Sequence, residues 1–281
     1  EHNTDMTETR VARVEQNTRH KAKPSTLGFT AHIQNPCGNH EATLLPTVFH
    51  GAGFAFNRSK FVDAKLRYPD EFRFYGEEYL LSMQIYSKGY RIEYQEGFKV
   101  CHRKSSIQRD KNKIFYYLAR NNKAIYNAIV PERYRQTALK DSLKRYELIS
   151  QKEKVYDSYL KGLDETIDAH EELPMSLKDF EAFSLIEHTK DLTLYASNAV
   201  LCGVGKFPTL WKEALKGAGF KKIFLCDFNT GLQGKKVAGT TVLTPEELIK
   251  LEDCQFIDFH CSASEKRKWQ HFLNEYKTFA V

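Results

Sequence analysis

The sequence predicts an α/β protein, and three observations carry this prediction. Short apolar runs alternate with turn residues between residues 46 and 102, which indicates strands around one helix. Residues 109–172 carry apolar side chains at helical spacing. From about residue 191, strand and helix patterns alternate, as is typical of a parallel sheet. We therefore expect three domains, at residues 1–108, 109–189 and 190–281.

The first 45 residues are polar and rich in loop formers. Their clearest extended segment is Thr26 to Ile33, and we expect the whole region to form an irregular edge of the fold. The stretch PTVFHGAGFAFNRSKF then alternates around a Gly-Ala-Gly sequence, as a strand does where two backbones approach closely. Asn57 to Ser59 is expected to form the turn that follows this strand.

The next stretch, FYGEEYLLSMQIYSKGYRIEY, predicts a helix from Gly76 to about Lys88. Gly89 follows as a helix stop. Two strands are expected after the helix, at residues 90–94 and 98–102.

The first turn of this helix carries two adjacent carboxylates, Glu77 and Glu78. The helix dipole favours each by about 0.3–1 kcal/mol, so a solvated helix start would account for them. A functional interpretation rests on their neighbours, because the glycine-rich strand precedes the helix and His102 ends the strand pair after it. We expect a carboxylate, flexible backbone and an imidazole to meet around one cleft.

The net charge of +6 is unevenly distributed. Residues 51–150 hold 20 Lys and Arg against 11 Asp and Glu, whereas residues 151–281 hold 17 against 20. A basic middle segment fits a solvated face, a phosphorylated ligand or an anionic membrane surface. No nucleic-acid-binding motif accompanies it, so we expect no nucleic-acid partner.

The six cysteines show no tight pair spacing, which predicts reduced thiols rather than disulfides or a zinc site. No apolar run approaches the roughly 18 residues needed to span a bilayer, and the first residues lack a signal-peptide pattern. We expect a cytoplasmic protein, and the basic segment is compatible with peripheral work at a membrane.

Four short motifs in fixed order now suggest a family: GAGFAF, FYGEEYLLSMQIYSKGYRIEY, VCH and YYLARNN. Together they resemble the second half of a GT-A glycosyltransferase of the bacterial family-two type. They are most similar to the branch that transfers N-acetylglucosamine to protein hydroxyproline. The match spans residues 46–125. It implies a partial GT-A domain, a nucleotide-sugar donor and a hydroxyl acceptor on a glycan or protein.

The resemblance also implies roles for the acidic pair and the histidine. Glu78 matches the family's catalytic base, which in inverting members takes the proton of the acceptor hydroxyl. Glu77 would help to hold the acceptor. His102 matches a histidine that helps to bind a divalent ion, manganese or magnesium, at the diphosphate leaving group. By itself, a histidine after a strand is more often a satisfied polar residue than a ligand.

Two further motifs carry implied substrate-binding roles. Gly51, Ala52 and Gly53 would let the backbone approach the donor sugar, although they also fit a simple bulge. Arg120 and Asn121 match a recurrent Arg-Asn pair, where contact with phosphate and structural support are both open.

The sequence departs from the family because no Asp-x-Asp metal motif occurs in its 281 residues. We therefore expect this chain by itself to transfer no sugar, and the full-length product to do so. Inverting and retaining chemistry both stay open. The alternative is a non-catalytic nucleotide-binding regulatory or scaffolding protein with a degenerate GT-A half.

In the C-terminal part, Gly203 and Gly205 precede a helix and Asp227 closes the next strand, which is the layout of a dinucleotide fingerprint. Pro208 stands where the third glycine is expected. The region resembles small Rossmann-like domains attached to bacterial sugar-modifying enzymes, which implies a nucleotide at these three residues. A packing module that binds nothing is equally open, and an NAD-dependent oxidoreductase is disfavoured because no Ser-Tyr-Lys or His-Asp set is evident.

Overall fold

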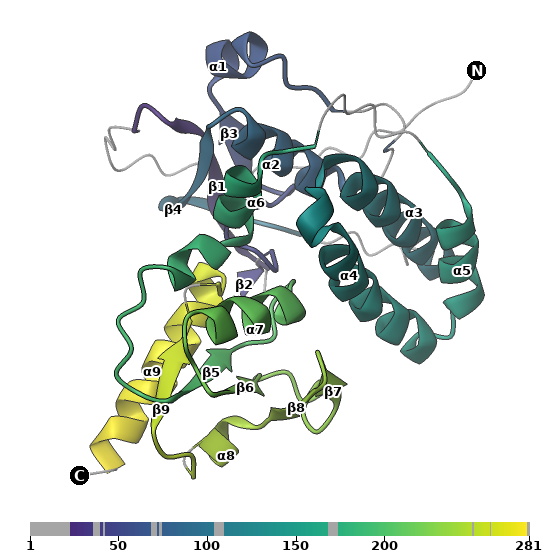
Figure 1. Cartoon of the computed structure of the whole chain (residues 1–281). Helices are drawn as coiled ribbons and strands as arrows, with labels where there is room; N and C mark the ends of the chain where they lie inside the picture. The colour runs from purple at the N-terminus through teal and green to yellow at the C-terminus, as the bar shows by residue number, and fades with distance from the viewer. Residues whose placement is uncertain are drawn as a thin grey trace, which may run out of the picture.

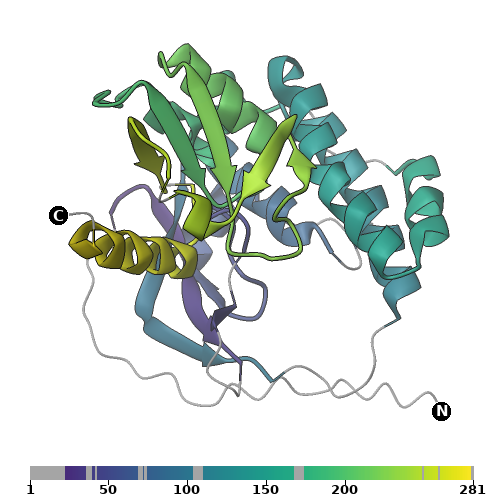
Figure 2. The ribbon, with the colours of Figure 1, turned by 90° about the horizontal axis from the view of Figure 1, so that it is seen from below.

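The fold of the chain is α/β, as predicted (Figure 1). It was obtained as a computed structural model that describes residues 23–35, 40–41, 43–68, 72, 75–103, 110–167, 174–248, 250–258 and 260–279. Predictions for the first 22 residues and for Phe74 lie outside the described residues. One sheet is formed by the N-terminal part and another by the C-terminal part, and Figure 2 shows the yellow-green strands of the C-terminal sheet nearest the viewer.

The N-terminal sheet is built around a buried strand that the sequence analysis placed at an irregular edge. Its strands are β1 (Thr26–Gln34), β2 (His40–Glu41), β3 (Phe54–Phe56) and β4 (Arg91–Cys101). Strand β1 pairs antiparallel with β2 and β3 and parallel with β4. The edge prediction was wrong because β1 is buried on both faces. Its buried side chains include polar ones, so its sequence lacks the apolar run that usually marks a central strand.

Strand β4 is continuous, where the sequence predicted two strands. Its pairing with β1 jumps from Ala31 opposite Gln95 to His32 opposite Lys99. This irregularity falls at the interruption that the sequence analysis read as a strand end. A bulge therefore takes up the extra residues without ending the strand.

Two helices connect β3 to β4. Helix α1 (Arg58–Asp63) begins where a turn was expected, because the Asn57 side chain accepts a hydrogen bond from the Lys60 amide and caps the helix. Helix α2 (Glu77–Ser87) follows Gly76 as predicted, and its residues from Leu80 to Tyr86 are buried.

The middle of the chain is helical, as expected. It contains α3 (Lys111–Ile129), α4 (Glu132–Lys152), α5 (Tyr156–Asp164), α6 (Leu177–Ser184) and the 3₁₀ turn η1 (Ile186–Thr189). Helices α3 and α5 pack closely because Gly162 has no side chain: a Cβ there would lie 2.2 Å from the Tyr116 carbonyl oxygen. Within the described residues, no helix is both long and apolar enough to cross a membrane.

The C-terminal sheet has the strand order β7-β8-β6-β5-β9. Its strands are β5 (Asn198–Cys202), β6 (Lys222–Cys226), β7 (Lys236–Val237), β8 (Thr240–Leu243) and β9 (Cys254–Ile257). Its helices are α7 (Pro208–Gly217), α8 (Pro245–Leu248) and α9 (Ala263–Phe279). Strands β8, β6, β5 and β9 run parallel, so the parallel strands stand in the order third, second, first, fourth. This is the order of the first four strands of the doubly wound nucleotide-binding fold.

Alternate side chains of this sheet face two different hydrophobic clusters. Ala199 and Leu201 point to the cluster that includes α7, whereas Val200 and Cys202 point to the one that includes Trp269 of α9. Helices therefore cover both faces of the sheet, which is the arrangement expected for parallel strands.

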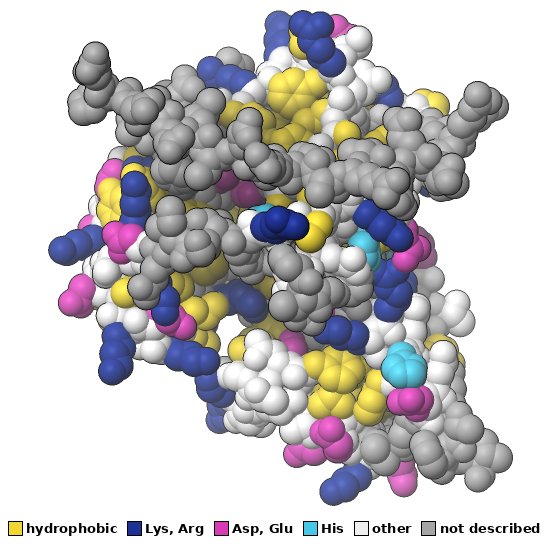
Figure 3. Space-filling model, turned by 180° about the vertical axis from the view of Figure 1, so that it is seen from behind, with side chains coloured by type: hydrophobic (Ala, Val, Ile, Leu, Met, Phe, Trp, Pro, Cys, Tyr) yellow, Lys and Arg dark blue, Asp and Glu magenta, His cyan; other side chains and the backbone are white. Residues whose placement is uncertain are grey.

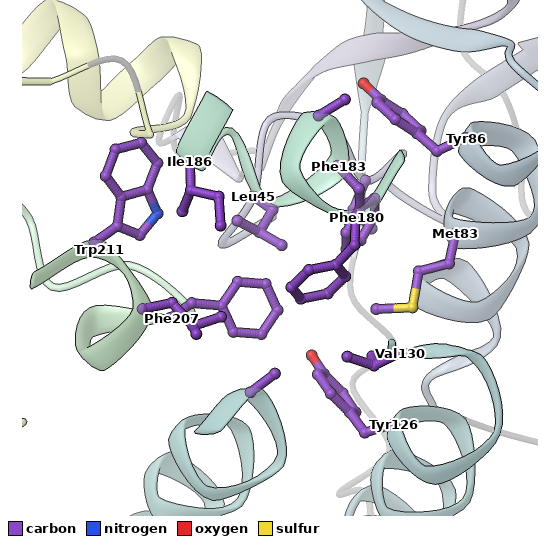
Figure 4. Close-up of a cluster of buried hydrophobic side chains, with 14 of the residues drawn as sticks. Leu45, Met83, Tyr86, Tyr126, Val130, Phe180, Phe183, Ile186, Phe207 and Trp211 are labelled. Carbon is purple, nitrogen blue, oxygen red and sulfur yellow. The ribbon is translucent and has the colours of Figure 1, made fainter. Parts of the chain in front are cut away.

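The largest hydrophobic cluster joins the C-terminal domain to the rest of the chain (Figure 4). Phe207, at the start of α7, is fully buried. Its ring centroid lies 5.9 Å from that of Tyr126 in α3 and 6.0 Å from that of Phe180 in α6. The regions expected as three domains thus share one continuous core.

Candidate functional site

The centre of the candidate site is a tight turn from His50 to Gly53. The Gly53 amide donates to the His50 carbonyl oxygen at 2.9 Å, and the Ala52 amide donates to His50 Nδ1 at 3.1 Å. The His50 amide donates to Thr30 Oγ1 at 2.9 Å, which ties the turn to β1. These bonds hold Gly51 at the exposed tip of the turn.

Glu78 lies directly against this tip. A Cβ built on Gly51 would lie 2.5 Å from Glu78 Oε1, so the carboxylate occupies the space that a side chain at this position would need. Gly51 has no positive φ, so the close approach of this carboxylate, rather than backbone conformation, is what favours a glycine here. The structure therefore brings together two residues, Gly51 and Glu78, that the sequence analysis placed in one cleft.

His102 reaches the same turn from the end of β4. Its amide donates to the Gln34 carbonyl oxygen at 2.7 Å, and its ring centroid lies 6.1 Å from that of His50, edge to face. Glu78 and His102 thus approach one turn, Glu78 at Gly51 and His102 at His50. The sequence analysis missed His50, whose only signal was its place immediately before Gly51.

Burial changes the protonation of the two glutamates. It raises the pKa of Glu77 from 4.5 to about 7, with a smaller contribution from the charge of Glu78. Burial also raises the pKa of Glu78, although hydrogen bonds from the backbone at the start of α2 oppose this. Oε2 of Glu77 is buried and has no hydrogen-bond partner among the described residues. Two adjacent carboxyl groups with raised pKa values are suited to moving a proton near neutral pH.

The backbone that leads into α2 is held in an uncommon conformation. Tyr75 and Gly76 have φ values of +64° and +105°. Asn121 donates from Nδ2 to the Tyr75 carbonyl oxygen at 2.7 Å, and Arg120 donates from Nε to Asn121 Oδ1 at 2.9 Å. A non-glycine residue in this region costs on the order of 1–3 kcal/mol, so the Asn121 bond helps to fix the direction of the glutamates.

Arg120 is expected from the sequence to bind substrate or to give structural support, and its contacts match support. Its guanidinium is buried, lies 4.7 Å from the Tyr117 ring centroid and pairs with Glu165 at 3.3 Å. We interpret Arg120 as a positioning residue behind Asn121.

Gly53 and Ala52 differ from Gly51 in their surroundings. A Cβ on Gly53 would lie 2.7 Å from Ile33 Cδ1 and 2.9 Å from Ala31 Cβ, so this glycine permits packing against β1. Ala52 is partly buried and packs against the same small cluster. Only Gly51 of the three lies against a carboxylate.

The predicted divalent ion has an incomplete set of ligands. Across the described ranges of the chain, no group of three or more His, Cys, Asp or Glu side chains could hold a metal ion. His50 and His102 supply two imidazoles, whereas manganese and magnesium are usually held through oxygen ligands. These residues alone do not fit a complete manganese or magnesium site.

The chain was compared with known protein families, curated proteins and solved structures. The family model described as Glycosyltransferase (GlcNAc) matches residues 3–181, well over half of the chain. The chain belongs to this family. The match includes the candidate site and also helices α3 to α5, which the sequence analysis had assigned to a separate helical region at residues 109–189. No curated protein and no solved structure matches the chain.

The C-terminal domain lies beyond the residues that the family model matches. Gly203 and Gly205 have φ values of +91° and +64°, which explains the glycines between β5 and α7. Asp227 accepts hydrogen bonds from the Val204 and Asn229 amides at 2.9 and 2.8 Å. Its carboxylate therefore holds the turn, which differs from the ribose contact implied by the fingerprint.

The start of α7, where a nucleotide phosphate would be expected, is occupied by a carboxylate from α4. Asp141 accepts hydrogen bonds from the Thr209 amide at 2.8 Å and from its hydroxyl at 2.5 Å. Burial raises the pKa of Asp141 to about 6, although the bonds from Thr209 and Leu210 oppose the increase. Asp141 thus caps α7 across the two parts of the chain.

Lys206, after the glycine turn, extends from the C-terminal domain toward α2, α3 and α4. Its Nζ lies 4.5 Å from the Tyr79 ring centroid, 4.8 Å from that of Tyr146 and 3.4 Å from Asn122 Oδ1. Burial lowers the pKa of Lys206 well below its ordinary value. Because Tyr79 directly follows Glu78, the C-terminal domain packs behind the acidic pair.

Gly51→Ala is expected to lower the turnover number of the full-length enzyme at least tenfold with little loss of stability. The new methyl group forces the Glu78 carboxylate out of its position, and misplacement of a reacting group by about 1 Å can cost up to about a hundredfold in rate. Transfer kinetics and the melting temperature are measured together. Gly217→Ala is the control, because a Cβ there meets nothing within 4 Å. Full activity in Gly51→Ala would contradict the assigned position of Glu78.

Proposed function

We propose that this protein transfers a sugar, N-acetylglucosamine by the description of its family, from a nucleotide-sugar donor to a hydroxyl acceptor. The observation that carries the proposal is the contact between the Glu78 carboxylate and the Gly51 turn, beside His50 and His102. The described N-terminal part would form the acceptor side of a GT-A domain.

In the proposed reaction, Glu78 acts as general base. It takes the proton of the acceptor hydroxyl while the hydroxyl oxygen forms a bond to the anomeric carbon of the donor. The bond between that carbon and the diphosphate oxygen breaks, and the diphosphate leaves with the electron pair. Such direct displacement inverts the anomeric configuration, so NMR of the product linkage tests the role of Glu78. A retained configuration would exclude this direct displacement.

Glu77 is proposed to hold the acceptor. Its unpartnered Oε2 can accept a hydrogen bond from an acceptor hydroxyl, or donate one when the carboxyl is protonated. A pKa of about 7 means that both forms are populated at neutral pH.

The free energy of unfolding of Glu77→Gln, relative to that of the wild type, is expected to increase between pH 5 and pH 8. The folded pKa of Glu77 is raised, so the folded state binds this proton more tightly than the unfolded chain. The wild type therefore loses stability as the pH rises from the unfolded pKa of 4.5 through the folded pKa of about 7. The variant has no titrating group at position 77 and keeps its stability over this range. After discounting for the partly exposed carboxyl, we expect a change on the order of 1 kcal/mol.

Urea unfolding of wild type and Glu77→Gln at both pH values measures this change. Glu246→Gln, an exposed glutamate in the C-terminal domain, serves as the control because its pKa is lowered rather than raised. A difference in stability that is the same at pH 5 and pH 8 would contradict the raised pKa of Glu77.

His102 is proposed as one ligand of a manganese or magnesium ion. The remaining ligands would have to come from the donor diphosphate and from other residues of the enzyme. Because the 281 residues contain no Asp-x-Asp motif, we propose that this chain by itself does not turn over a nucleotide sugar. Release of the nucleoside diphosphate by the isolated chain would contradict that statement.

The acceptor is proposed to be a glycan or a protein, with protein hydroxyproline suggested by the motif order. Incubation of the full-length enzyme with uridine diphosphate N-acetylglucosamine and hydroxyproline peptides or oligosaccharides, followed by mass spectrometry, separates these acceptors. The enzyme is proposed to act in the cytoplasm, in peripheral contact with an anionic membrane. The free thiols of Cys101, Cys202, Cys226, Cys254 and Cys261 support a reducing compartment.

A further inference from the structure

A cleft of about 670 Å³ lies between helix α4 and the C-terminal domain, away from the Gly51 turn. It is formed by α4, by the turn after β5 and by residues 229–239 after β6. Its volume lies in the range of roughly 300–1,000 Å³ that is usual for small-molecule sites. In Figure 3, dark blue Lys and Arg side chains gather around a hollow between the helical part and the C-terminal domain.

The charge of the cleft is strongly positive. Among the described residues that line it, Asp141 alone carries an acidic side chain, and this side chain is engaged with Thr209. The basic residues on the wall are Lys140, Lys144, Arg145, Lys152, Lys206, Lys235 and Lys236. Lys144 pairs with Glu147 at 2.9 Å. In the part of the chain that the structure describes, no ion pair to a carboxylate involves Arg145, Lys235 or Lys236. Cations from separate segments that face one hollow favour an anion with more than one charge.

The same cleft has an apolar side. Leu148 and Ile149 of α4 face it from one wall, and Leu232, Val237 and Ala238 face it from the other. A ligand that satisfies both sides carries charge at one end and a flat or apolar group at the other. Inorganic anions lack the second feature, and simple lipids or detergents lack the compact multiple charge.

The position of the cleft in the sheet points to a nucleotide. Residues 204–205 and 229–232 follow the carboxyl ends of β5 and β6, and ligands of doubly wound sheets bind outside this edge. Asp141 holds the start of α7, so a phosphate cannot take that place while the cap is intact. The phosphates would instead contact side chains of α4 and the Lys235–Lys236 pair.

We propose that this cleft binds a nucleoside diphosphate, with its phosphates on Lys144, Arg145, Lys235 and Lys236 and its base against the apolar walls. The site differs from the fingerprint contact expected at Asp227, because α4 supplies half of it. It is also separate from the acceptor site at Glu78. Binding here would bridge α4 and the C-terminal domain.

Isothermal titration of the chain with uridine diphosphate, adenosine diphosphate and inorganic pyrophosphate tests the proposal. We expect saturable binding of at least one nucleotide, at least tenfold tighter than that of pyrophosphate. The double variant Lys235→Ala/Lys236→Ala should weaken nucleotide binding at least tenfold. Lys221→Ala/Lys222→Ala is the matched control, since it removes two exposed adjacent charges at the start of β6, outside the cleft.

Three results would overturn the proposal: no saturable nucleotide binding up to millimolar concentration, equal weakening in both double variants, or pyrophosphate binding as tight as that of the nucleotides. Melting temperatures of both variants within 2–3 °C of the wild type, measured in the same experiment, exclude unfolding as the cause of a loss. The readout is binding without transfer, so its outcome does not depend on the role of Glu78.

Discussion

Glu78→Gln is expected to lower the turnover number of the full-length enzyme at least a hundredfold and to leave donor affinity within about threefold. Glutamine keeps the shape of the side chain and a hydrogen bond to the acceptor, but it cannot take the proton of the hydroxyl. General bases contribute about 10²–10⁴-fold in rate. Burial also raises the pKa of Glu78, which makes its carboxylate a stronger base than one in water.

Single-turnover rates and donor titrations separate the chemical step from binding. Glu132→Gln is the matched control. Glu132 is an exposed glutamate in the first turn of α4, and its substitution removes the same charge as Glu78→Gln. The control should keep the wild-type rate. A Glu78→Gln enzyme that retains more than a tenth of the rate, or that loses donor binding in proportion to rate, would contradict the assignment of Glu78 as base.

Phe207→Ala is expected to destabilise the whole chain by about 3–5 kcal/mol, the usual cost of removing a buried phenylalanine ring. Phe207 belongs to the C-terminal domain, yet its ring contacts Tyr126 and Phe180 in the family-matched part. The cavity would therefore open in a core that both parts share. We expect the variant and the wild type each to unfold in one transition.

Two probes report on different parts of the chain in this experiment. Trp211 and Trp269 both lie in the C-terminal domain, so their fluorescence follows that domain, whereas far-ultraviolet circular dichroism is weighted toward α3 and α4. Tyr195→Ala is the control, because Tyr195 is 74% exposed. Separate transitions for the two probes, or a loss below 1 kcal/mol, would show that the domains fold independently.

Local sequence patterns predicted the helices and strands that are specified by a few neighbouring residues. Gly76 and the doubled glutamate indicated the start of α2, and the alternation after residue 191 indicated the parallel sheet. Prediction failed for β1 and for the continuity of β4. Both depend on pairing: the bulge in β4 is defined only by its partner, and the central place of β1 only by the strands on both sides of it.

The candidate site divides in the same way. Glu78, Gly51 and His102 could be named from motif order, because each motif is local and resembles those of a known family. The contacts of Arg120 and Asp227 became visible only in the structure: Arg120 contacts Asn121 and Glu165, which fits the supporting role left open by the sequence, and Asp227 accepts a hydrogen bond from the Val204 amide. His50, Asp141 and Lys206 gave no pattern that distinguishes them from ordinary polar residues.

By itself, the sequence determined the α/β class, the helix that begins with the acidic pair, the glycine turns and the resemblance to sugar transferases. Only the tertiary structure decided that Glu78 fills the space beside Gly51, that Asp141 caps a helix 68 residues away and that Lys206 is buried behind the glutamates. The physical reason is range: backbone preferences and hydrophobic periodicity act over a few neighbouring residues, whereas these contacts join side chains that only the packed core brings together.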